Sequence, residues 1–148
     1  MSEPVFLHDW AGEGLAGMVE DFTRYSETPE SEGFKQTQAL RQQLPNMDIV
    51  LASYTYENYS GSAFVLFYDR EQQGYFEVHG SHCSCYGLEG QWEPEPCSYA
   101  SLMHRLDEGE LGKDWKQNVF ADELRAALKT QPGHRMLRWI DEGREVAA

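Results

Sequence analysis

The central part of the chain contains three short apolar runs separated by turn-forming residues. The runs lie near 48–56, 62–69 and 74–79, and they are rich in β-branched and aromatic side chains. Such runs, bounded by Gly, Asn and Asp, are typical of strands joined by tight turns. The pattern predicts a three-stranded antiparallel meander over about residues 48–79.

The middle run is apolar on both of its expected faces. Successive residues of a strand point to opposite sides of the sheet. One side receives Ala63, Val65 and Phe67, and the other receives Phe64, Leu66 and Tyr68. A strand of this kind belongs in the centre of a sheet that is covered on both sides.

Segments before and after the meander repeat their apolar residues every three or four positions, which indicates amphipathic helices. These segments are residues 10–25, 97–109, 118–130 and 131–146. Residues 34–44 are expected to form a short polar helix that ends before Pro45. Asp9, Ser98 and Asn118 are the candidate N-caps of three of them. Helices, then strands, then helices predict an α+β fold, with the meander packed by N-terminal and C-terminal helices.

The length and composition fit one globular unit. A chain of 148 residues, 41% of them apolar, can bury one core, so we expect residues 1–148 to form a single domain. The longest apolar run is far shorter than the roughly 20 residues that span a bilayer, and no signal peptide is apparent. Three cysteines do not suggest a disulfide framework, so we expect a cytoplasmic protein without membrane contact.

The net charge of -13 argues against nucleic acid as a direct partner, because phosphate binding depends on Lys and Arg. A strongly acidic surface is instead suited to a protein with a basic surface, and it speeds association at low salt. The alternative is that the charge serves solubility alone.

The heptapeptide HGSHCSC, residues 79–85, offers several metal donors in one short stretch. The best set for zinc is His79, Cys83, Cys85 and Cys97. The spacing is poor, because one residue rather than two separates the cysteine pair and no second pair exists. We expect no cofactor, with zinc as the alternative.

Two other interpretations of this stretch remain. Cys83 or Cys85 could be a nucleophile with His79, His104 or His134 as base, which would make loop 80–97 the pocket of a small hydrolase or nucleotide-binding protein. The surrounding negative charge disfavours a thiolate. We favour the third interpretation, a shaped loop with small buried cysteines.

No P-loop, G-x-S-x-G, H-E-x-x-H or EF-hand string is present, and no catalytic residue is assigned. Aromatic residues on turns are instead candidates for contacts with a protein partner, since Tyr and Trp bury much area at low entropic cost. With nearby acids, the predicted partner-binding residues are Glu20, Asp21, Glu57, Tyr59, Tyr86, Glu89, Trp92, Glu93 and Glu95.

The strings YENYSGSAFVLF and EVHGSHCSCYGLEGQWEPE, within residues 50–96, resemble a group of small proteins encoded mainly by bacteriophages and prophages. The resemblance implies a phage gene that acts in the bacterial cytoplasm, and it assigns no residue a role. Together with the charge, it suggests an accessory protein that inhibits a host protein. The target would be a defence enzyme, for example of a CRISPR system, or another nucleic-acid-handling enzyme.

Overall fold

The computed structural model describes residues 3–24, 33–84, 87–113, 118–133, 135–137 and 139–140. Its strands are β1 (Val5–His8), β2 (Met47–Glu57), β3 (Ser60–Asp69), β4 (Gly74–Cys83) and β5 (Glu95–Pro96). Its helices are α1 (Gly14–Thr23), α2 (Phe34–Gln43), the 3-10 turn η1 (Leu44–Asn46), α3 (Tyr99–Asp107) and α4 (Ala121–Lys129). Residues 133, 135–137, 139 and 140 are helical as well. The predicted α+β class is confirmed, and none of these described helices is long and apolar enough to cross a membrane.

The sheet is larger than the predicted meander. Its order is β1-β2-β3-β4-β5, in which β2, β3 and β4 are antiparallel neighbours. Strand β1 pairs in parallel with β2, and β5 adds two residues to the other edge. The expectation of three strands was therefore incomplete, because the short edge strands depend on contacts distant in sequence. In the part of the chain that the structure describes, the sheet is mixed and has five strands.

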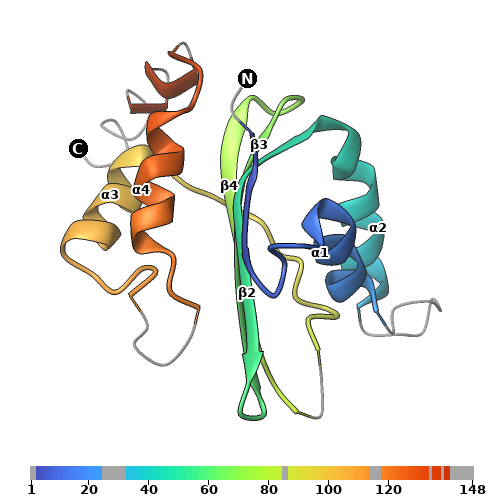
Figure 1. The fold of residues 1–148 in the computed structure, drawn as a ribbon. Helices are drawn as coiled ribbons and strands as arrows, with labels where there is room; N and C mark the ends of the chain where they lie inside the picture. Colours follow the sequence, from blue (N-terminus) through green and yellow to red (C-terminus); the bar gives the residue numbers. More distant parts are fainter. Residues whose placement is uncertain are drawn as a thin grey trace.

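Helices cover both faces of the sheet, with α1 and α2 on one side and α3 and α4 on the other (Figure 1). The middle strand contributes to both cores, as its alternation predicts. Phe64 and Leu66 pack in the core beneath α3 and α4, whereas Val65 and Phe67 pack in the core beneath α1 and α2. All four side chains are at most 1% exposed.

Only one of the three predicted helix caps is present. The Ser98 hydroxyl accepts a hydrogen bond from the Ser101 amide at the start of α3, as expected. Asp9 does not cap α1; its carboxylate accepts a hydrogen bond from the amide of Tyr56. Asn118 does not cap α4, because its side chain is buried against Ser53 of β2. Both polar side chains join segments far apart in the chain, which local spacing does not reveal.

Strand β4 continues through residues 80–83, which the sequence analysis placed in a loop. His82 pairs with Gly61, and Cys83 pairs with Ser60. The ladder requires only backbone groups, so small polar residues can extend a strand beyond its apolar part. Gly61 leaves room for the His82 ring in its present position, because a Cβ on residue 61 would lie 2.2 Å from Nε2 of His82.

Candidate functional site

The β2–β3 hairpin projects beyond the helices at one end of the molecule (Figure 1). Its turn consists of Asn58 and Tyr59, with φ angles of 52° and 66°, and Glu57 pairs with Ser60 across it. Two consecutive positive φ angles are typical of a type I′ turn, which prefers Asn followed by Gly. Tyrosine in the left-handed region costs roughly 1–2 kcal/mol, yet this Tyr59 side chain is 79% exposed.

The residues behind the turn hold the hairpin in place. The ring of Tyr56 packs edge-on against His82, with 4.9 Å between ring centroids. The His82 Nδ1 lies 2.8 Å from the Cys83 carbonyl, which can only accept, so Nδ1 carries the proton. In neutral His82, Nε2 then accepts from the Tyr54 hydroxyl at 2.6 Å. Burial, and then Asp21, raises the pKa of Tyr54, which keeps that donor protonated.

Charge near the turn is negative. Glu57 is exposed, and the carboxylate of Asp9 accepts a hydrogen bond from the amide of the neighbouring residue Tyr56. The sequence has no Lys or Arg between Arg41 and Arg70 or between Arg70 and Arg105, so β2, β3 and β4 contribute none. We call residues 56–60, with Asp9 and His82, the hairpin tip. It combines exposed aromatic and carboxylate groups without a cation from the strands that form it.

The structure does not gather the predicted contact residues at one place. Glu57 and Tyr59 lie at the hairpin tip. Glu20 and Asp21 lie on α1, where Asp21 accepts from Nε1 of Trp10 at 2.7 Å. Glu95 lies on the edge strand β5.

The remaining predictions concern the loop between β4 and β5. Glu93 is exposed, whereas Glu89 accepts from the Gly87 amide within the loop. The prediction that Trp92 contacts a partner disagrees with the structure, because its side chain is 2% exposed in the core and donates to Gln43. A tryptophan in a Gly- and Pro-rich stretch can either pack into the core and fix the loop or lie exposed and contact a partner. The turn-like sequence alone does not distinguish these two roles. Tyr86 lies outside the described residues.

The described histidines and cysteines of residues 79–97 lie at different places in the fold. His79 lies on the α3 side of β4, where its ring contacts Phe64. His82 lies on the α1 side, where its ring contacts Tyr54. Cys83 is exposed at the end of β4, while Cys97 packs in the core beneath α3. Cys85 lies outside the described residues, so the proposed zinc set cannot be placed in full. Within the described part of the chain, no three His, Cys, Asp or Glu side chains are grouped to hold a metal ion.

Glu77 is the centre of an ion cluster that no sequence pattern predicted. Both carboxylate oxygens accept from Arg105 of α3, at 2.8 and 2.6 Å, and Oε1 also lies 2.6 Å from Nε2 of His79. Burial alone would raise the pKa of Glu77, but the hydrogen bonds from His79 and Arg105 lower it to about 2. Burial, and then the charge of Glu77, raises the pKa of Cys97, which opposes formation of a thiolate. The cluster joins α3 to the sheet rather than activating a nucleophile.

The ionised carboxylate of Glu77 should make the free energy of unfolding depend on pH in the acid range. Its pKa of about 2 lies below the reference value of 4.5, so its contribution is complete above pH 4.5 and is lost as the pH falls towards 2. We expect the gap in unfolding free energy between the wild type and Glu77→Gln to shrink by roughly 2 kcal/mol between about pH 7 and pH 3. Urea denaturation at both pH values measures this gap. Glu57→Gln at the exposed tip is the control, and an equal change in both variants would contradict the assignment.

Comparisons with known proteins identify no relative. No protein-family model matches the chain, and neither the curated proteins nor the solved structures include a match.

Proposed function

We propose that this chain is an acidic accessory protein, of the phage-encoded kind that its central segment resembles. It binds a host protein with a basic, nucleic-acid-binding surface and blocks access of the nucleic acid. The hairpin tip is the contact. The observation that carries the proposal is Tyr59, which is 79% exposed in a strained backbone conformation that glycine would adopt without cost.

The chemistry of the tip fits an arginine-rich partner. Tyrosine is enriched among the residues that dominate binding energy, and its ring attracts a guanidinium group. Glu57 and Asp9 provide carboxylates within the same tip, and Arg can bind a carboxylate through two hydrogen bonds. A surface that normally binds phosphates supplies such arginines.

The difference in charge between the two helical layers indicates which side of the protein faces the partner. The described residues of the α1/α2 layer (9–24, 33–46 and 87–94) contain six acids and three bases. Those of the α3/α4 layer (97–113, 118–133 and 135) contain five of each. The excess of carboxylates on the α1/α2 side supports an approach in which that layer faces the basic partner and the α3/α4 layer faces away.

Affinity capture with tip variants tests this proposal. The bait is incubated with bacterial lysate at about 50 mM salt, where electrostatic attraction is weakly screened. We expect the wild type to retain a basic nucleic-acid-binding protein and to lose most of it at about 300 mM salt. Tyr59→Ala and Glu57→Lys should each retain much less.

Two matched variants on the α3/α4 layer serve as controls. Glu108→Lys makes the same charge change as Glu57→Lys at an exposed position, and Leu137→Ala removes an exposed apolar side chain. Both should capture as the wild type does. Retention that is equal in tip and control variants, or absent for the wild type at low salt, would refute the proposal.

A further inference from the structure

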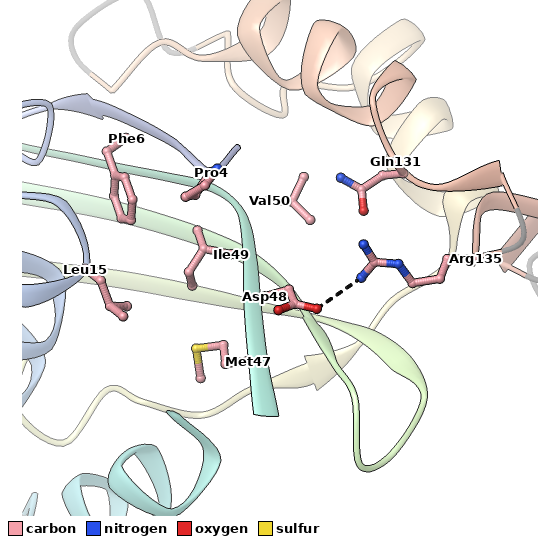
Figure 2. Close-up of a pocket in the computed structure, with 9 residues that line it drawn as sticks. All are labelled: Pro4, Phe6, Leu15, Met47, Asp48, Ile49, Val50, Gln131 and Arg135. Atoms are coloured by element: carbon pink, nitrogen blue, oxygen red, sulfur yellow. Dashed lines mark hydrogen bonds and ion pairs between the residues drawn. The ribbon is translucent and has the colours of Figure 1, made fainter. Parts of the chain in front are cut away.

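A pocket of about 230 Å³ lies at the start of β2, at the opposite end of this strand from the hairpin tip. Figure 2 shows the residues that line it. Strand β1 pairs with β2 only from Leu51 onward, so Met47–Val50 extends beyond it without a neighbouring strand on that side among the described residues. The apolar part of the lining includes Phe6 of β1, Leu15 of α1 and Ile49 of β2. The pocket exists because the edge strand is too short to cover its neighbour.

Two arginines share one carboxylate at the polar side of the pocket, and of these three residues Asp48 and Arg135 line the pocket itself. Nη1 of Arg135 lies 3.4 Å from Oδ2 of Asp48, and the side chain of Arg135 is 11% exposed. Arg70 pairs with the other oxygen of Asp48. Among the described residues, Asp48 is the only carboxylate paired with two arginines, so the group carries one net positive charge within a strongly acidic protein.

Arg135 and Gln131 have N–H groups that can donate hydrogen bonds to a ligand in the pocket. The guanidinium of Arg135 has five N–H donors, and within the described residues it makes one long hydrogen bond and a cation–π contact 4.3 Å from the centre of the Tyr68 ring. Gln131 accepts from the Tyr75 hydroxyl at 2.8 Å through Oε1, which leaves its amide nitrogen to donate elsewhere. In Figure 2, Gln131 and Arg135 lie together at one side of the pocket, and Phe6 and Leu15 lie on the opposite side.

We propose that this pocket binds a monocarboxylate that carries a compact apolar group. The carboxylate accepts from Arg135 and Gln131, and the apolar group packs among Phe6, Leu15 and Ile49. The volume is below the roughly 300–1,000 Å³ of sites for drug-sized ligands, which restricts the group to about the size of one side chain. A free acid and the C-terminal residue of a peptide share this chemistry.

Titration with matched acid and amide probes distinguishes the two sources. Phenylacetate and phenylacetamide differ only in the charged group, and Gly-Gly-Phe with a free or amidated C-terminus tests a peptide. Binding is followed by NMR chemical-shift changes of the full chain. We expect saturable binding of at least one acid, at least about tenfold tighter than that of its amide. Binding of phenylacetate indicates a free acid, and binding of the peptide alone indicates a C-terminus.

Variants connect the binding to this pocket. Arg135→Gln should weaken binding of the acid by about tenfold or more, and Leu15→Trp should do so by filling the pocket without removing a donor. Arg125→Gln, which removes an arginine from α4 outside this pocket, should bind as the wild type does. Failure of both acids to bind, equal binding of acid and amide, or unchanged binding by Arg135→Gln would overturn the proposal. None of these outcomes depends on the hairpin tip.

Discussion

Replacing Arg105 with methionine is expected to lower the free energy of unfolding by about 3 kcal/mol. The Glu77 side chain is only 7% exposed, so loss of its bidentate partner leaves a buried carboxylate with His79 alone. Removal of one member of a buried ion pair usually costs about 3–5 kcal/mol, and the remaining hydrogen bond places this case at the lower end. Urea denaturation at pH 7 measures the loss.

A second arginine pair provides the control for this measurement. Arg125 and Asp107 pair at the surface, with side chains 35% and 51% exposed. Arg125→Met should therefore cost less than about 1 kcal/mol. The double variant Glu77→Met with Arg105→Met should recover much of the stability lost in Arg105→Met. Equal losses for the two arginines would show that the Glu77 cluster does not hold α3 to the sheet.

Replacing Tyr59 with glycine is expected to change stability and partner binding in opposite directions. Glycine adopts the positive φ of 66° without strain, so the free energy of unfolding should rise by about 1 kcal/mol. The same change removes the exposed ring, and we expect the captured partner to bind at least about 30-fold more weakly, as for the loss of a dominant contact residue. Thermal unfolding and a binding titration measure the two effects.

Asn58→Gly is the matched control, because it also relaxes a left-handed residue of the turn but keeps Tyr59. Asparagine tolerates this region better than tyrosine, so the gain in stability should be smaller, and partner binding should be unchanged. A loss of stability in Tyr59→Gly, with no change in binding, would mean that the ring serves the fold of the hairpin rather than a partner.

The apolar pattern located the three central strands because their own side chains form both cores. It could not predict β1, whose four residues pair in parallel with a strand more than 40 positions away. It also could not predict that residues 80–83 extend β4, since backbone pairing with β3 carries no apolar signal. The Ser98 cap was predicted correctly, because its hydroxyl accepts from the Ser101 amide, only three residues away at the start of the same helix.

Candidate site residues were predicted least well where their roles depend on distant partners. Tyr59 could be placed on an exposed turn from its neighbours Asn58, Ser60 and Gly61. Trp92 had similar turn-like neighbours but fills a gap in the core beneath α1 and α2. The pairing of Glu77 with Arg105 spans 28 residues and two elements, and no spacing in the sequence indicates it.

We expect the hairpin tip to compete with nucleic acid for a basic surface of the host protein. The most direct test of this competition is a titration in which fluorescence anisotropy follows a labelled nucleic acid bound to the captured host protein. We predict that wild-type protein displaces the nucleic acid, and that Tyr59→Gly requires at least about 30 times the concentration while Asn58→Gly does not. Nucleic acid that stays bound at saturating wild-type protein would contradict the claim.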